Sequence, residues 1–191
     1  LEHLYTAPAF DAPLLQTPQL LGLGRCTACQ LVCTTGTGRA AVAGTYTTEY
    51  YGSATNKFLS LIERTLHLLK TLHARKITRT WRRSRPANSL PSVLDIGCGR
   101  GQLLAAFQSL GAVVLGLERA EFPVHELPGD TVRTGSITDP EYADRKFDII
   151  ILWHVLEHLE AQEQLLEVIA DHLNQDGLLV IAVPNFSSLQ Q

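Results

Sequence analysis

Apolar residues in the second half of the chain form short runs that alternate with segments of helical periodicity. The runs have the length of strands and end at glycine or polar turns, whereas the segments between them repeat apolar residues every three or four positions. This alternation predicts a parallel β-sheet covered by helices on both faces. The predicted strands are residues 93–96, 113–117, 131–133, 147–152 and 178–183, and the predicted helices are residues 102–110 and 162–173.

The first half of the chain has a different pattern. Residues 1–54 combine prolines, threonines and glycines with three cysteines, which predicts an irregular N-terminal extension. From residue 55, apolar residues recur at helical spacing and predict one amphipathic helix, followed by a basic linker. Residues 55–91 are therefore expected to join the extension to a core at residues 92–191. The apolar positions of the helix are Phe58, Ile62, Leu66, Leu69 and Leu72.

Charge and hydropathy restrict the partners. The formal net charge is -3 over 191 residues, which argues against nucleic acid as the main partner. Residues 75–85 nevertheless hold six cations and no acid; we interpret this run as a solvated linker, with an anion-binding strip as the alternative. No apolar run approaches the roughly 18 residues that span a bilayer, and no signal-peptide pattern is present. We therefore expect a cytoplasmic protein with no membrane partner.

A glycine-rich turn is the most informative feature of the sequence. The predicted strand at residues 93–96 runs directly into Gly97, Gly99 and Gly101, and a predicted helix begins at the next residue. Glycines allow a tight turn and let a ligand approach the backbone more closely than any Cβ would permit. In a doubly wound sheet this turn lies at the carboxyl end of the first strand, where ligands bind.

Two carboxylates accompany the turn. Asp95 precedes the first glycine by two residues, where it can meet a ligand ammonium group while helix N–H groups face a carboxylate. Glu118 follows the second predicted strand, close to the place at which Rossmann-type proteins bind ribose hydroxyls. The dinucleotide fingerprint would require glycine at Gln102, so a nicotinamide-dependent enzyme is a disfavoured alternative. The pattern predicts an adenosine cofactor with an amino-acid tail.

Five segments of the core resemble, in order, the motifs of class I S-adenosylmethionine (SAM)-dependent methyltransferases. They are VLDIGCGRG, VVLGLERA, TGSITD, FDIIILWHVLEHL and GLLVIAVPN, and they are most similar to the quinone-biosynthesis and related small-molecule group. The resemblance covers residues 92–185 and implies a Rossmann-like, doubly wound α/β sheet with strand order 3-2-1-4-5 and SAM as the cofactor. Family members usually add a hairpin after the fifth strand. We expect the core to lack it, and its open edge makes a homodimer a candidate.

The resemblance also implies roles for individual residues. The glycine turn would line the methionine end of SAM with Asp95 behind it, Glu118 would hold the ribose, and Arg119 would lie beside the adenine. After the third strand the family usually has an acid near the adenine amino group, where this chain has Ser136. The cofactor-binding candidates are Asp95, Gly97, Cys98, Gly99, Gly101, Glu118, Arg119, Ser136, Ile137, Trp153 and Tyr51.

His154 and His158 are the candidate catalytic residues. They follow the fourth predicted strand as HVLEH, which also matches the HxxEH pattern of zinc peptidases. Such a zinc site would need a third ligand among the last 33 residues, and the family position already explains the segment, so a metal is disfavoured here. For His158, a structural packing role and a general-base role both stay open.

The cysteines of the extension suggest a metal site. Cys26 and Cys29 form a CxxC element, with Cys33 four residues later. This segment resembles the second of two CxxC elements found at the N-terminus of several methyltransferases of this type, and the sequence holds no first element. Zinc at Cys26 and Cys29 is therefore a candidate, and a set of free thiols is the alternative.

Three tyrosines, Tyr46, Tyr50 and Tyr51, precede the predicted helix. Aromatic residues in this part of related methyltransferases close over the cofactor, and covering the sheet edge is an equal alternative. Methyl transfer from a sulfonium needs alignment and exclusion of water more than a strong base. The sequence therefore predicts a methyltransferase acting on a small molecule, such as a quinone, polyketide or sugar-like acceptor. The alternatives are a SAM-binding module without activity and, on the basic run alone, a nucleic-acid or protein methyltransferase.

Overall fold

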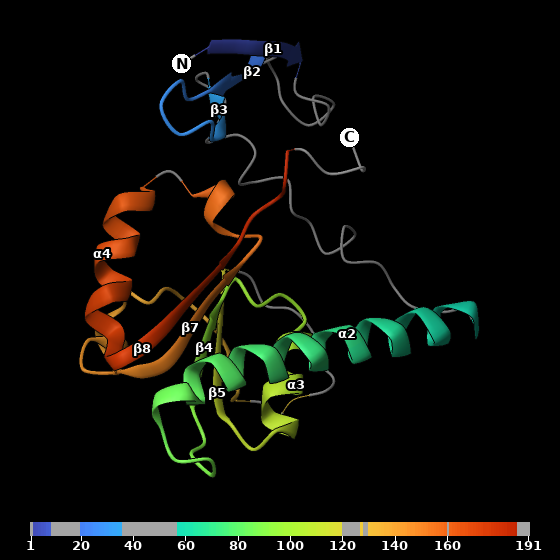
Figure 1. Ribbon diagram of the computed structural model, residues 1–191, viewed down its shortest axis with the longest axis vertical. Helices are drawn as coiled ribbons and strands as arrows, with labels where there is room; N and C mark the ends of the chain where they lie inside the picture. The colour runs from blue at the N-terminus through green and yellow to red at the C-terminus, as the bar shows by residue number, and fades with distance from the viewer. Residues whose placement is uncertain are drawn as a thin grey trace. The chain divides into compact units, whose positions relative to one another are not determined.

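The chain forms two compact units, which Figure 1 shows in a computed structural model. The structure describes residues 2–8, 20–35, 57–119, 127, 130–159 and 161–186. The first unit comprises Leu1–Ser53, His158–Glu160 and Pro184–Gln191, and the second comprises Ala54–Glu157 and Ala161–Val183.

The N-terminal unit contains a three-stranded antiparallel sheet. Its strands are β1 (Glu2–Pro8), β2 (Leu20–Arg25) and β3 (Val32–Thr35), in the order β1-β2-β3. The expectation of an irregular extension was wrong for these residues. A tight hairpin aligns β2 with β3: the Cys26 N–H donates to the Leu31 carbonyl over 2.8 Å, and the Gln30 N–H donates to the Cys26 carbonyl over 2.9 Å. Pro8 at the end of β1 and Gly22 and Gly24 within β2 are residue types that strands usually avoid, so the composition did not indicate strands here.

The second unit is built on a five-stranded parallel sheet. The order is β6-β5-β4-β7-β8, which is 3-2-1-4-5 when the strands are numbered along this part of the chain. The strands are β4 (Ser92–Ile96), β5 (Val113–Glu118), β6 (Val132–Thr134), β7 (Phe147–Trp153) and β8 (Leu173–Ala182).

Helices cover both faces of this sheet, as the sequence predicted. Helices α2 and α3 lie on one face and α4 lies on the other (Figure 1). The bounds are α2 (Lys57–Trp81), α3 (Gln102–Ser109) and α4 (Gln162–His172), with short 3-10 turns η2 (Arg82–Ser84), η3 (Pro140–Tyr142) and η4 (Leu156–His158).

The central strands β4 and β7 carry runs of adjacent apolar residues, such as Val93 and Leu94 or Ile149 to Leu152, because both of their faces are buried. Val93 packs with Phe107 of α3 on one face, whereas its neighbour Leu94 packs with Ile169 of α4 in the core on the other face. Successive side chains of a strand point to opposite faces, so two apolar cores need an unbroken apolar run. This arrangement leaves the carboxyl ends of β4, β5 and β7 side by side for the functional site.

Helix α2 does not bury the stripe that the periodicity predicted. Leu66, Leu69 and Leu72 are 41 to 49% exposed, and the side chains of Phe58 and Ile62 lie outside the described residues. The C-terminal half of α2 instead packs on the sheet, through residues that include two polar side chains, and the N-terminal half projects past α3 (Figure 1). Periodicity locates an apolar face but does not reveal which half of a long helix reaches the core. The residues that face the core are Lys70, Ala74, Ile77, Thr78 and Trp81.

Strand β8 begins five residues earlier than predicted. Leu173 pairs with Phe147 directly after α4, and the ladder resumes where Leu178 pairs with Ile149, so residues 174–177 bulge out of the sheet. The bulge is held by the guanidinium of Arg85, which donates to the carbonyl of Asp176 over 2.9 Å. Arg85, the last cation of the basic run, thus stabilises the fold.

Candidate functional site

The glycine turn has the backbone geometry that its sequence predicted. Gly97, Gly99 and Gly101 have φ angles of +70°, +54° and +72°, in the left-handed region that favours glycine. The Gly97 N–H donates to the Leu117 carbonyl over 2.7 Å, so the turn stays attached to β5. A Cβ at Gly97 would collide with the side chain of Val155. Helix α3 starts directly after Gly101 and points the unpaired N–H groups of its first turn toward the loop.

The Glu118 carboxylate lies against this turn. One oxygen accepts the Gly99 N–H over 2.9 Å, and the other accepts the Arg119 N–H over 2.8 Å. A carboxylate has about four acceptor positions, so both oxygens keep capacity for ligand hydroxyl groups. The side chain of Arg119 is exposed. Glu118 therefore lies at the junction of β5 and the glycine turn, and its role in ribose binding stays a prediction.

Asp95 is the buried charge of the site. It is 2% exposed, and its Oδ1 atom has no hydrogen-bond partner. Burial raises the pKa of the carboxyl group to about 7; the Lys70 ammonium opposes this rise, and Glu118 adds to it. Buried polar atoms are normally satisfied, so an unpaired carboxylate oxygen beside a glycine turn indicates a missing cationic partner.

Cys98 occupies the middle of the turn and is packed beneath it. A Cβ at Gly116 would come within 2.6 Å of the Cys98 sulfur, so the glycine in β5 leaves room for this side chain. Burial raises the pKa of the Cys98 thiol far above its ordinary value. Cys98 therefore fills space as a neutral thiol, and its backbone rather than its sulfur is available to a ligand.

Lys70 is a site residue that the sequence analysis missed. Its ammonium nitrogen lies 4.8 Å from the ring centre of Trp153, at the end of β7. Burial lowers the pKa of Lys70, and Asp95 counteracts that shift. Within the described part of the chain, no ion pair shorter than 4 Å joins Lys70 to Asp95. Its helical spacing could have identified it, because Lys70 lies on the same face of α2 as the buried residues Ala74 and Trp81.

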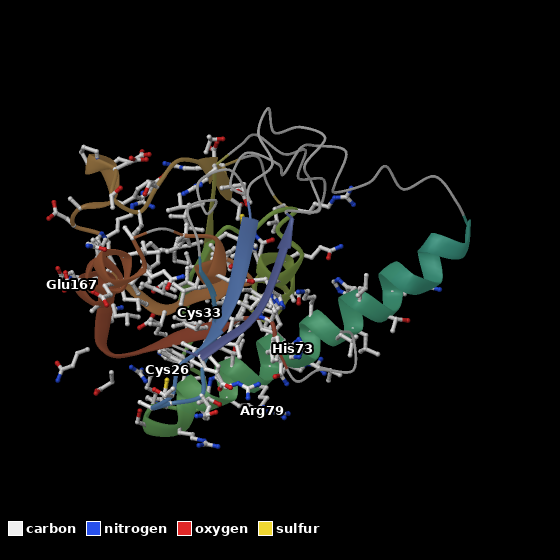
Figure 2. All side chains as sticks on the ribbon, turned by 90° about the horizontal axis from the view of Figure 1, so that it is seen from above. Cys26, Cys33, His73, Arg79 and Glu167 are labelled. Atoms are coloured by element: carbon white, nitrogen blue, oxygen red, sulfur yellow. The ribbon has the colours of Figure 1, made fainter. Side chains whose placement is uncertain are left out.

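Trp153 and His154 line the end of β7. The ring of His73, which Figure 2 labels on α2, lies 5.0 Å from the Trp153 ring, and the His154 ring meets its edge at 6.2 Å. His154 itself is exposed, and its Nδ1 lies 3.4 Å from Oε1 of Glu157. At this distance the Glu157 carboxylate can orient the imidazole ring of His154.

The segment HVLEH does not form the helix that a zinc-peptidase site requires. His154 precedes η4 and has a φ of +55°, whereas His158 ends this single 3-10 turn, so the two histidines do not share an α-helical face. The described residues contain no cluster of three or more potential metal ligands. His158 belongs to the first unit, and its role in catalysis stays a prediction.

The carboxylate of Asp139 lies beside Ser136, the residue for which the resemblance implies a place near the adenine. The Ser136 N–H donates to Oδ2 of Asp139 over 2.8 Å, and the Ser136 hydroxyl lies 2.8 Å from that of Thr138. The Gly135 N–H donates to the Glu118 carbonyl over 2.9 Å, which ties this loop to β5. Ile137 is buried in the core. Sequence position alone did not show that Asp139 folds back onto Ser136.

The remaining predicted site residues lie in the N-terminal unit or outside the residues that the structure describes. Cys26 and Cys29 lie in the β2–β3 hairpin, and backbone N–H groups of Cys29 and Ala28 hold the pKa of the Cys26 thiol below its ordinary value. All the cysteines are free, and Cys33, labelled with Cys26 in Figure 2, donates weakly to the Gly24 carbonyl over 3.7 Å. Zinc at this hairpin stays a prediction. The tyrosines at positions 46, 50 and 51 lie outside the described residues.

Comparison with protein families gives one match over most of the chain. The family model described as a methyltransferase domain matches residues 62–191. These residues include the second half of α2, the glycine turn and every strand of the parallel sheet.

Curated relatives match the same region. The ubiquinone biosynthesis O-methyltransferase of Glaesserella parasuis is 34% identical over 110 residues, which cover 49% of this chain and 45% of that protein. The enzyme of the same name from Bartonella bacilliformis is 32% identical over 101 residues, covering 49% of this chain and 41% of the relative. The chain thus spans less than half the length of these curated relatives.

Solved structures share the fold. Streptomyces venezuelae DesVI is 25% identical with a TM-score of 0.53, over 71% of this chain and 60% of that one. The SAM-bound amino pentose methyltransferase CalS10 of Micromonospora echinaspora gives a TM-score of 0.53 at 23% identity, over 71% of this chain and 59% of the other. No helix in the described ranges is long and apolar enough to cross a bilayer.

Proposed function

Because this chain belongs to the methyltransferase-domain family, we propose that it binds SAM and transfers its methyl group to a small-molecule acceptor. One observation carries the proposal: the buried Asp95 carboxylate has an unpaired oxygen beside a turn in which three glycines have positive φ angles. An amino-acid ammonium group is the partner that such a carboxylate lacks.

The residues around the turn fit the remaining groups of SAM. Lys70 and the first N–H groups of α3 supply positive charge for the carboxylate of the amino-acid end. Glu118 keeps acceptor capacity for the ribose hydroxyls. The carboxylate of Asp139, beside Ser136, offers an acceptor for the adenine amino group. Lys70 and Asp95 thus offer a positive and a negative charge at separate places, one for each charged group of the zwitterionic amino-acid end.

We infer that the acceptor is a phenolic hydroxyl compound. The names of the curated relatives support this class, since both are O-methyltransferases of ubiquinone biosynthesis.

When bound, SAM supplies a methyl group on a sulfonium sulfur, and the C–S bond breaks as the bond from the acceptor oxygen to the methyl carbon forms. His154 takes the acceptor proton on its imidazole, and the Glu157 carboxylate, 3.4 Å from Nδ1, orients the ring. The Trp153 ring provides a flat surface for the acceptor and excludes water.

A SAM-binding module without activity is the second candidate. It is favoured by the exposed position of His154. Formation of S-adenosylhomocysteine from SAM in the presence of catechol would separate a methyltransferase from such a module.

Calorimetry tests the cofactor assignment. We expect the 191-residue chain to bind S-adenosylhomocysteine and not NAD. Asp95→Ala should lower that affinity by roughly tenfold or more, since it removes a hydrogen bond between charged groups. Asp144→Ala, which removes an exposed carboxylate away from the turn, should leave the affinity unchanged. Tighter binding of NAD, or equal losses in both variants, would contradict the assignment.

A further inference from the structure

Helix α2 carries an exposed side that the packed core does not use. Leu68 and Leu72 lie on it with 57% and 49% exposure, and Arg75 and Arg79 continue the same line at spacings of three and four residues. Leu69 and Lys76 flank this line. We call these six residues the outer face of α2. They lie opposite the side on which Ala74 and Trp81 enter the core, and Figure 2 shows Arg79 on the helix away from the sheet.

The outer face is strongly cationic and has no acid to neutralise it. No aspartate or glutamate occurs between residues 64 and 94, whereas the chain as a whole has a net charge of -3. Other cations of the run are engaged within the unit: Arg82 donates to the Ser89 carbonyl over 2.8 Å, and Arg85 holds the β8 bulge. In the described part of the chain, Arg75 and Arg79 form no ion pair.

The combination of leucines and cations selects one kind of partner. A nucleic-acid surface would be served by the cations alone and would gain nothing from three half-exposed leucines. An anionic bilayer uses both, because apolar side chains enter the boundary between headgroups and acyl chains while lysines and arginines contact lipid phosphates. A helix that lies in the interface does not have to span the membrane, so the lack of an apolar run of spanning length places no limit on it.

We propose that the outer face of α2 docks the protein onto anionic lipid bilayers. The opposite side of the same helix carries Lys70 and His73, which flank Trp153 in the candidate site. Docking would hold the site within one helix diameter of the lipid surface, where apolar acceptors partition. The docking itself depends only on the outer face and stands whether or not the proposed methyl transfer is correct.

Vesicle flotation tests the proposal with the 191-residue chain. We expect the chain to float with vesicles of phosphatidylcholine and phosphatidylglycerol, and not with vesicles of phosphatidylcholine alone. The double variant Arg75→Gln/Arg79→Gln should lose most of this binding, roughly tenfold or more, and added salt should have the same effect. Leu68→Ser/Leu72→Ser should also weaken it at unchanged charge.

A matched variant controls for net charge. Arg145→Gln/Lys146→Gln removes two exposed cations from the turn before β7 and should bind vesicles like the unchanged chain. Circular dichroism and thermal unfolding establish that each variant is folded. Absence of flotation, equal binding to uncharged vesicles, or equal losses in the control would overturn the proposal. Binding of an oligonucleotide that depends on Arg75 and Arg79, without vesicle binding, would also overturn it.

Discussion

The Gly99 N–H donates to Oε2 of Glu118 over 2.9 Å, so the acid at the end of β5 holds the glycine turn after β4 in place. The two residues are 19 positions apart in the sequence, and parallel pairing of β4 with β5 brings them together. The same carboxylate therefore shapes the loop and faces the ligand, which makes Glu118 both a structural and a binding residue.

Replacement of Glu118 should reveal both roles. We expect Glu118→Ala to weaken S-adenosylhomocysteine binding by roughly 10- to 100-fold, because hydrogen bonds to a charged group are lost. Unfolding should become easier by about 1 kcal/mol, since the Gly99 N–H loses its acceptor. Calorimetry and thermal unfolding measure the two effects. Glu163→Gln, in the exposed first turn of α4, is the control and should change neither. An unchanged affinity in Glu118→Ala would remove it from the binding site.

Gly97 should not tolerate any side chain. Gly97→Ala places a Cβ at a φ of +70° and against Val155, so we expect a loss of about 2 to 5 kcal/mol in unfolding free energy. Adding Val155→Ala should restore the share of the unfolding free energy that is lost through the collision with Val155. Gly111→Ala is a matched control: its φ is +87°, but its Cβ would meet only a flexible end of Leu90 at 3.2 Å. Denaturant unfolding should rank Gly111→Ala as the milder change.

The raised pKa of Asp95 predicts a dependence of stability on pH. Its folded pKa of about 7 exceeds the ordinary aspartate value of 3.8, so the folded state binds the proton more tightly than the unfolded state. Stability from this group is therefore present below pH 4 and is lost as the pH rises through 7. Asp95→Asn mimics the protonated form, so it should stabilise the ligand-free chain strongly at pH 8 and clearly less at pH 5, where only the first part of the loss between pH 4 and pH 7 has occurred. Thermal unfolding at the two pH values checks this; equal effects at both would contradict it.

The features that could be predicted from the sequence are those fixed by local backbone chemistry. Gly97, Gly99 and Gly101 were identifiable because their positive φ angles favour glycine. Asp95 and Glu118 were identifiable because the predicted strands place them beside that turn. Their side-chain partners depend on the fold and were not all predictable. Asp139 is an example, since a short loop folds it back onto Ser136.

Lys70 shows why the other part of the site was missed. It lies 25 residues before Asp95, on a helix whose most regular apolar positions include the exposed Leu66, Leu69 and Leu72. The buried face of that helix is set by where α2 crosses the sheet, which is a tertiary property. A cation half-buried among Ala74 and Trp81 therefore looked like an ordinary solvent-facing lysine.

Lys70 should act on the amino-acid end of the ligand and on nothing else. We expect Lys70→Met to weaken S-adenosylhomocysteine binding by about tenfold or more, because the ligand carboxylate loses a cation. Binding of 5′-methylthioadenosine, which has no amino-acid end, should stay the same in this variant. Lys70→Arg keeps the positive charge, so it should still bind S-adenosylhomocysteine more tightly than 5′-methylthioadenosine, by nearly the same factor as the unchanged chain. If both ligands lose affinity equally in Lys70→Met, the lysine only supports Trp153 by packing.

His154 should affect the chemical step and not cofactor binding. In an assay of methyl transfer to catechol, His154→Ala should lower kcat by roughly 100-fold, because the acceptor hydroxyl loses its proton acceptor. Glu157→Gln should cause a smaller loss, since the carboxylate only orients the imidazole through the 3.4 Å contact to Nδ1. S-adenosylhomocysteine affinity should be unchanged in both variants, which separates a role in catalysis from a role in holding the cofactor. His67→Gln, an exposed position on α2, is the control. A drop in cofactor affinity with kcat preserved would assign His154 to the binding site and leave the acceptor proton to solvent.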